Sequence, residues 1–368
     1  MTTDRLNRLY TLMSAHGLDV LALNPGPTLT YLTGLEFHLM ERPVVLLLSP
    51  GTSPMMVLPE LEQAKIPQSR ITLEPFPYGE NPAGWGAVFA RAAQAARLDG
   101  RIIGVEPTLL RFLEFQYLQA AAPQARLVSG AQPLAQLRLQ KSPAEVACMR
   151  RAVQIAENAL GATLRLIRIG MTEREIAGEL TLQLLRSGSD SAFPFKPIVS
   201  GGPNGANPHA SPGDRPIQSG DLLVIDWGAA HDGYISDLTR TFAVGDVDEE
   251  CRRICEIVRQ ANAAGRAAGR PGLPAGQVDE ITRAVIDQAG YGAYFIHRTG
   301  HGIGMEGHEA PYIYGENDLL LAEGMAYTVE PGIYLPDRNG VRIEDNVIIT
   351  AGGCETLSTL PRELITIG

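Results

Sequence analysis

The chain has 368 residues, of which 45% are hydrophobic and 20% are charged, a composition typical of globular proteins and a length that favours two domains. Its 31 basic and 41 acidic residues give a formal net charge of −10. This charge excludes the basic surface that binds nucleic acids or anionic membranes. Four cysteines in so long a chain also exclude a disulfide scaffold.

The first residues, MTTDRLNRLYTLMSAHG, have the pattern of an amphipathic helix and lack the basic tip and apolar core of a signal peptide. The longest tight apolar run, residues 44–48, is far shorter than the roughly 20 residues that a membrane-spanning helix needs. We therefore expect a soluble cytoplasmic protein with no membrane partner.

Residues 1–125 alternate between strand and helix patterns. Short apolar runs that end in Gly, Pro or Asn predict four buried strands, at residues 18–24, 43–49, 54–60 and 101–107. Residues 87–98 and 109–121 have helical spacing and contain good helix formers. The pattern predicts an α/β domain over 1–125, without a phosphate-binding loop or a cluster of titratable residues.

We place a linker at residues 126–142 and a second domain at 143–368. Ser142-Pro143-Ala144-Glu145 is a strong helix start, with a Ser cap, a Pro at the first position and a Glu that reaches back. Thr172 and Glu175 repeat this capping box before another helix. A hairpin then follows, whose strands at 222–229 and 234–242 are joined by His231-Asp232-Gly233.

The same order of elements occurs again in the last third of the chain. Helical patterns at 248–269 and 274–290 precede a Gly/His-rich loop and a second hairpin, formed by 326–334 and 341–350. The second domain is therefore predicted to be an α+β fold with a pseudo-duplicated helix–helix–hairpin unit. Such a fold would set the two hairpins side by side, with the helices packed behind them.

Each hairpin contains two carboxylates in an apolar context: Asp226 and Asp237 in the first, Glu330 and Glu344 in the second. Carboxylates are depleted in strands and costly to bury alone. One such residue would favour a solvent-facing position at a hairpin edge, but four in symmetric positions favour a shared partner. With His301 in the Gly/His-rich loop, the set suits two divalent cations, and oxygen-rich ligation favours Mn²⁺ over a thiolate zinc site.

These motifs resemble a known family. The strings VIDWGA, SDLTRTF, HRTGHGIGMEGHE, TVEPGIY and VRIEDN are similar to the five metal-site blocks of the metallopeptidases that include aminopeptidase P, prolidase and methionyl aminopeptidase. The resemblance covers about 143–368 and implies the pita-bread fold for that region. The α/β half resembles the accessory domain of the proline-specific members, which methionyl aminopeptidases lack.

The resemblance implies a role for each matching residue. Two divalent ions, Mn²⁺ with Co²⁺ or Zn²⁺ as alternatives, would be held by Asp226, Asp237, His301, Glu330 and Glu344. Asp237 and Glu344 would bridge the ions. His209 and His308 would be catalytic together with Glu330, and His297 would lie near the substrate. Gly307 departs from the family, which usually has Ile or Val before the second histidine.

Hydrolysis of the Xaa-Pro bond in proline-containing peptides is the activity that the resemblance implies. The two ions would lower the pKa of a shared water, Glu330 would move its proton, and His308 and His209 would hydrogen-bond the oxyanion. We interpret Arg342, two residues before Glu344, as a partner that orients a metal ligand and faces the substrate. Related enzymes are commonly oligomeric, so we expect a homodimer.

Whether the substrate is a longer peptide or a dipeptide depends on a carboxylate-binding group. Many prolidases carry an Arg shortly after the second histidine, where this chain has Tyr312. We therefore expect an Xaa-Pro aminopeptidase with Tyr312 at the substrate. The alternative is a prolidase that uses another cation, such as Arg42. A non-catalytic peptide-binding module and a metal-free hydrolase of creatine-like substrates are disfavoured, because all five ligand positions are intact.

Overall fold

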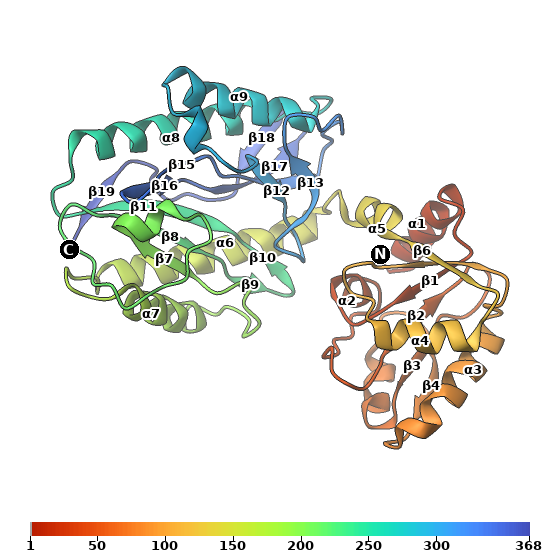
Figure 1. Cartoon of the computed structure of the whole chain (residues 1–368). Helices are drawn as coiled ribbons and strands as arrows, with labels where there is room; N and C mark the ends of the chain where they lie inside the picture. The colour runs from red at the N-terminus through yellow and green to blue at the C-terminus, as the bar shows by residue number, and fades with distance from the viewer. Residues whose placement is uncertain (1) are drawn as a thin grey trace. The chain divides into compact units, whose positions relative to one another are not determined.

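A computed structural model describes residues 2–368, with side chains from residue 4 onward. It divides into two compact units, residues 1–138 and 139–368, each with its own core (Figure 1). Among the residues described, no helix is both long and apolar enough to cross a lipid bilayer.

The first unit is built on a six-stranded mixed sheet with the order β4-β3-β2-β1-β5-β6. Its strands are β1 (Val20–Leu23), β2 (Val45–Leu48), β3 (Met55–Pro59), β4 (Glu74–Tyr78), β5 (Ile102–Val105) and β6 (Arg126–Ser129). Its helices are α1 (Thr2–Ala15), α2 (Pro27–Thr33), α3 (Trp85–Ala95), α4 (Phe112–Ala121) and α5 (Ala131–Arg138), with 3₁₀ segments η1 (Glu60–Gln68) and η2 (Pro82–Gly84). The four predicted strands and the predicted helices are confirmed.

Both faces of this sheet are buried, which explains why its strands are continuous apolar runs instead of alternating ones. In β1, Val20 and Ala22 pack with α3 and α4, while Leu21 and Leu23 point to the opposite face and are equally buried. The first unit is therefore an α/β domain, as the sequence predicts.

The predicted linker at 126–142 differs from the structure. Residues 126–129 form β6, which pairs in parallel with β5, and residues 131–138 form α5, which packs on α1. The strand is missed because only Leu127 and Val128 in it are apolar, too few for a recognisable pattern. The edge strand β4, EPFPY, is missed because two prolines interrupt it, and prolines are tolerated at sheet edges.

The helices of the second unit form two pairs, in which α6 packs on α7 and α8 packs on α9. They are α6 (Pro143–Leu164), α7 (Glu173–Arg186), α8 (Glu249–Ala268) and α9 (Ala275–Gln288), with 3₁₀ segments η3 (Gly202–Ala206) and η4 (Gly292–Tyr294). Both predicted capping boxes are confirmed. The hydroxyls of Ser142 and Thr172 each accept from the backbone N–H of the glutamate three residues on, and the carboxylate of that glutamate accepts from the backbone N–H of the cap residue. Figure 1 shows the strands of this unit between the two helix pairs.

The strands form a four-stranded sheet, β19-β11-β8-β7, a five-stranded sheet, β13-β12-β14-β17-β18, and two small ladders, β9·β10 and β15·β16. Their bounds are β7 (Ile198–Gly201), β8 (Leu222–Trp227), β9 (Ala230–His231), β10 (Tyr234–Ile235), β11 (Leu238–Val244), β12 (Gly300–Gly302), β13 (Glu309–Ile313), β14 (Ala326–Val329), β15 (Gly332–Leu335), β16 (Asn339–Arg342), β17 (Asp345–Thr350), β18 (Gly353–Thr356) and β19 (Ile365–Ile367).

The two predicted hairpins are confirmed, and both have the same two-step plan. In the first, the ladder β8·β11 is followed by the short ladder β9·β10, which closes on a turn in which Asp232 and Gly233 have φ of 51° and 75°. In the second, β14·β17 is followed by β15·β16. A backbone bridge between Thr239 and Glu344 joins the hairpins, with the Glu344 N–H 3.0 Å from the Thr239 carbonyl oxygen. The hairpins therefore lie side by side, as predicted.

Candidate metal centre

Carboxylates occupy the points where each hairpin changes from one ladder to the next. Asp226 is the only one within a strand, β8, whereas Asp237 directly precedes β11, Glu330 follows β14 and Glu344 follows β16. The sequence had placed all four within strands. Asp226 alternates with Ile225 and Trp227, which pack toward α6 and α7, so its side chain lies on the opposite face, toward the second hairpin.

The backbone that carries Asp237 is fixed by a side chain of the second hairpin. Asn346 is fully buried, its Oδ1 accepts from the Asp237 N–H at 3.0 Å, and its Nδ2 donates to the Asp237 carbonyl at 2.6 Å. The contact links a loop in one hairpin to a strand in the other. It therefore holds the first hairpin's carboxylate in register with those of the second.

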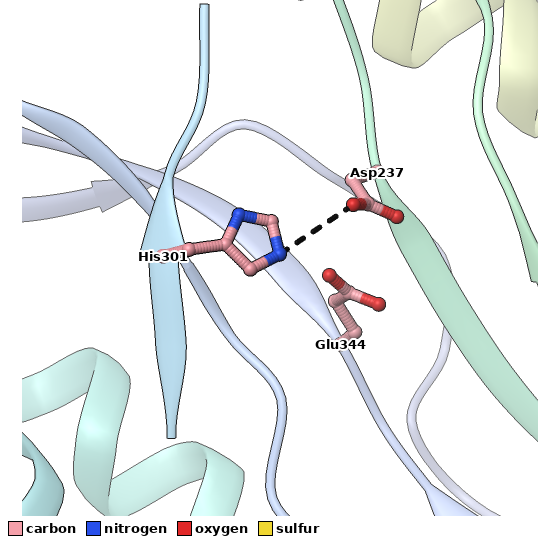
Figure 2. A group of neighbouring side chains, drawn as sticks. All are labelled: Asp237, His301 and Glu344. Atoms are coloured by element: carbon pink, nitrogen blue, oxygen red, sulfur yellow. Dashed lines mark ion pairs between the residues drawn. The ribbon is translucent and has the colours of Figure 1, made fainter. Parts of the chain in front are cut away.

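Asp237, His301 and Glu344 form a buried group that can hold a metal ion. One nitrogen or oxygen atom from each lies within 4.8 Å of the others. Figure 2 shows the His301 ring pointing toward the two carboxylates, with its Nε2 at 3.8 Å from Asp237 Oδ2. The Glu330 Oε1 lies 3.2 Å from the same nitrogen.

Hydrogen bonds to the surrounding chain orient these donors. His301 Nδ1 lies 3.2 Å from the Gly302 carbonyl, which can only accept, so this nitrogen carries the proton and Nε2 faces the carboxylates. The Thr239 hydroxyl donates to Glu344 at 2.7 Å, and the Thr328 hydroxyl donates to Glu330 at 3.1 Å. A fixed tautomer and oriented carboxylates are typical of the groups that surround metal ligands.

Asp226 is held by an arginine from the second hairpin. Arg342 is 3% exposed, and its Nη2 donates to Asp226 Oδ2 at 2.6 Å. The other oxygen, Oδ1, is buried and has no hydrogen-bond partner among residues 2–368. A buried carboxylate oxygen without a partner is costly, and a bound cation would satisfy it.

The electrostatics of the group favour a bound cation. Burial and the repulsion of neighbouring carboxylates raise the pKa of Asp237 and that of Glu344 well above their ordinary values. Burial also raises the pKa of Asp226, although the Arg342 charge opposes it. Against the effect of burial, contact with His301 lowers the pKa of Glu330 to about 2, and the same contact raises that of His301. Four oxygen donors and one imidazole thus form a set that fits divalent metal ions.

The group opens into a cavity of about 730 Å³, within the usual range of small-molecule sites. The five predicted ligands line it, as do the predicted His209, His297, His308 and Arg342. Further lining comes from Pro194, Phe195, Ile198, Pro208, Arg298 and Gly307. Tyr312 does not line the cavity. The residue is 37% exposed, and the centroid of its ring lies 4.4 Å from the guanidinium carbon of Arg298.

His209 lies in a loop that a single buried carboxylate fastens at both ends. Glu173, which is 1% exposed, accepts from the N–H of Gly201 at 2.7 Å and of Gly213 at 2.8 Å, and from the Asn204 side chain at 2.7 Å. The loop that brings His209 to the cavity is therefore anchored to the first turn of α7.

The other cavity histidines are bound to different partners. The His308 ring stacks on His301 with centroids 3.7 Å apart, and its Nδ1 lies 3.1 Å from Arg298 Nη2. Desolvation and the nearby His301 lower the pKa of His308 to about 4. His297 Nε2 lies 2.9 Å from the Tyr334 hydroxyl, which also accepts from Arg342 at 2.9 Å.

Sequence reasoning missed Arg298 and Tyr334. Arg298 lies within the quoted block HRTGHGIGMEGHE, directly after His297, so its position next to a predicted substrate residue was the available signal. Tyr334 is the last residue of the quoted block TVEPGIY and is buried, and the sequence pattern there indicates only an aromatic side chain of the core. Arg42, the alternative cation, forms ion pairs with Glu41 at 2.6 Å and Glu80 at 2.7 Å.

Comparisons with known proteins identify the family of both parts of the chain. Residues 147–351 match the metallopeptidase family M24, and residues 5–140 match the creatinase/prolidase N-terminal domain. The Xaa-Pro dipeptidase of Lactobacillus helveticus is 35% identical to this chain over 98% of both proteins.

Solved structures are similar over the whole chain. A prolidase from Thermococcus sibiricus is 32% identical, with a TM-score of 0.94 that covers 100% of this chain and 99% of the other. An X-Pro aminopeptidase from Thermotoga maritima is 29% identical, with a TM-score of 0.86 that covers 98% and 99%. The second unit thus has the predicted pita-bread fold. The chain belongs to metallopeptidase family M24 and is a metal-dependent peptidase.

Proposed function

We propose that the protein is an Xaa-Pro dipeptidase that uses two divalent ions, with Mn²⁺ preferred. The sequence favours an aminopeptidase, because it has Tyr312 where many prolidases carry an arginine. One observation offsets that argument: the guanidinium of Arg298 lies over the Tyr312 ring, so a cation is present in this region. The full-length similarity to an Xaa-Pro dipeptidase supports the same conclusion.

A dipeptide differs from a longer peptide in the carboxylate beside its proline ring, and this carboxylate needs a cation when it is buried. Two arginines, Arg298 and Arg342, line the cavity and supply this charge. Pro194, Phe195 and Pro208 give another part of the lining an apolar character that suits a proline ring or an apolar side chain.

The proposed ligands follow the donor set. Two divalent ions would be held by Asp226, Asp237, His301, Glu330 and Glu344, with Asp237 and Glu344 shared between them, Asp226 on one ion and His301 and Glu330 on the other. Oxygen-rich ligation of this kind favours hard ions such as Mn²⁺, with Co²⁺ or Zn²⁺ as alternatives. When bound, such ions would lower the pKa of a water molecule and polarise the scissile carbonyl.

The chain's own residues carry the rest of the mechanism. Against the effect of burial, contact with His301 lowers the pKa of Glu330, so this carboxylate is ionised at neutral pH. It would take up the proton of the attacking water and pass it to the leaving proline nitrogen. His308 and His209 donate hydrogen bonds to the carbonyl oxygen as it becomes negative. Both ring nitrogens of His297 already bond the protein, one to the Arg298 carbonyl and one to the Tyr334 hydroxyl, so its ring has a fixed position in the lining of the cavity.

The test compares Ala-Pro with Ala-Pro-Ala as substrates of the Mn²⁺-loaded protein, with an EDTA-treated sample as control. Preferred cleavage of Ala-Pro is the expected result. Preferred cleavage of Ala-Pro-Ala would replace the proposal with an Xaa-Pro aminopeptidase, the activity named for the Thermotoga maritima structure. Cleavage of neither, with metal bound, would contradict both.

A further inference from the structure

We propose that Arg298 is a positioning residue that holds the His308 ring in the tautomer with its proton on Nε2. The ring then offers an N–H to the cavity. The use of that donor on a peptide carbonyl rests on the proposed function, whereas the tautomer itself does not.

The inference starts from the polarity of one hydrogen bond. Arg298 Nη2 lies 3.1 Å from His308 Nδ1. A guanidinium has donors and no acceptor, so Nδ1 must accept and carries no proton. A neutral imidazole with an unprotonated Nδ1 has its proton on Nε2.

Arg298 is itself held in place, as a positioning role requires. Its guanidinium lies 4.4 Å from the centroid of the Tyr312 ring, at a distance typical of cation–π contacts. Its carbonyl oxygen lies 2.8 Å from His297 Nδ1. Among residues 2–368 no carboxylate forms an ion pair with it. Tyr312, which the sequence placed at the substrate, thus acts as a platform for Arg298.

The backbone near His308 makes such a restraint necessary. Gly307 directly precedes it, and glycine leaves the backbone more conformational freedom than any other residue. A Cβ at Gly307 would meet its nearest neighbour, Ile235, at 3.8 Å, so packing around this glycine does not fix the segment. The ring orientation depends instead on the stack with His301 and on the bond from Arg298.

The first experiment measures the tautomer. Imidazole ¹⁵N shifts are recorded on Zn²⁺-loaded protein, because Mn²⁺ broadens the signals, and His308 is assigned by its loss in His308→Gln. We expect an unprotonated Nδ1 and a protonated Nε2 in the unchanged protein. Arg298→Met should give a mixture of both tautomers, and Arg298→Lys should partly restore the original pattern. A protonated Nδ1 in the unchanged protein would overturn the proposal.

The second experiment measures turnover with whichever of Ala-Pro and Ala-Pro-Ala is cleaved. Removal of an oxyanion donor costs about 10²–10³ in kcat, and misorientation of one should cost less, so Arg298→Met should lower kcat about 10-fold with metal content unchanged. Arg253→Met is the matched control, since Arg253 also lies over an aromatic ring, that of Tyr291, but does not line the cavity.

The two experiments separate this inference from the proposed function. A raised KM in Arg298→Met follows from the substrate contact that the proposed function gives to Arg298, whereas an unchanged kcat would show that Arg298 does not position His308. If neither peptide is cleaved, the proposed function fails, while the ¹⁵N measurement still decides the tautomer.

Discussion

The two hairpins of the second unit share one plan but restrain their carboxylates differently. In the first, Asp226 is fixed by an ion pair with Arg342, and the backbone of Asp237 by Asn346, both partners from the second hairpin. In the second, Glu330 and Glu344 are oriented by the hydroxyls of threonines. Both aspartates thus depend on the second hairpin, Asp226 through a charge and Asp237 through a neutral amide, whereas Glu344 is bonded by Thr239 of the first hairpin and Glu330 by Thr328 of its own hairpin.

The difference indicates how the centre is assembled. The carboxylates of the two hairpins repel each other, since, besides burial, Asp237 of the first raises the pKa of Glu344 in the second, so the joined centre depends on positive groups. The bridge between Thr239 and Glu344 brings the pairs together, and Thr239 itself both donates to Glu344 and accepts from Arg342 Nε at 3.1 Å. The hairpins therefore form a single metal centre whose two halves should respond differently to substitution.

The largest effect should come from the residues proposed to bridge the ions, one from each hairpin. Asp237→Asn and Glu344→Gln each remove a negative charge while they keep the shape of the side chain. Both variants should lose activity and bound metal and still fold, because a neutral side chain relieves the repulsion that raises these pKa values. Metal analysis, circular dichroism and peptide hydrolysis check this. Full activity in either variant would disprove its bridging role.

Arg342→Met should have the next largest effect. The substitution affects the first hairpin most directly, because Arg342 forms the ion pair with Asp226. Loss of one partner of a buried ion pair costs about 3–5 kcal/mol, because the other charge is left uncompensated. The metal-free protein should lose roughly this much stability of folding, and bound metal should restore part of it by compensating Asp226. Denaturant unfolding with and without Mn²⁺ measures both values. An equal loss in both states would show that no cation compensates Asp226.

The sequence predicted the parts of this centre that depend on local patterns. The capping boxes at Ser142 and Thr172 and the Asp232-Gly233 turn are set by neighbouring residues, so the elements that they start or connect were found. Contacts between distant residues were not. The Arg342–Asp226 pair spans 116 positions, and nothing in a single sequence identifies which arginine meets which carboxylate.

A smaller effect is expected from the hydroxyl contacts of the second hairpin. Thr328→Val removes the donor to Glu330 and leaves the buried N–H of His301 without its acceptor. Loss of a contact that orients a ligand costs about 10–100-fold in metal affinity, and we expect the lower end of that range. Thr282→Val is the control, because Thr282 is equally buried but bonds within α9. Equal metal affinities in the two variants would contradict the role of Thr328.

The smallest effect is the pH dependence of the metal-free protein, and it tests both hairpins together. The folded-state pKa values of Asp226, Asp237, Glu344 and His301 are all raised. The three carboxylates favour the folded state only when protonated, and protonated His301 favours it as well, so each contribution is lost as the pH rises through its folded pKa. Glu330 has the opposite effect, because its pKa is lowered: its contribution to stability is lost only as the pH falls below about 4.5.

The melting temperature of EDTA-treated protein should therefore fall as the pH rises above 4.5, the ordinary pKa of Glu344, and fall further above 6.5, the ordinary pKa of His301. Saturation with Mn²⁺ should flatten this dependence, because bound cations replace the protons at these groups. Asp237→Asn should reduce the slope in the metal-free state, since it removes one of the raised carboxylates. Glu175→Gln is the control, because Glu175 is exposed at the start of α7 and its pKa is lowered, so it does not titrate in this range. A melting temperature that rises with pH in the metal-free protein would contradict the raised pKa values of these four groups.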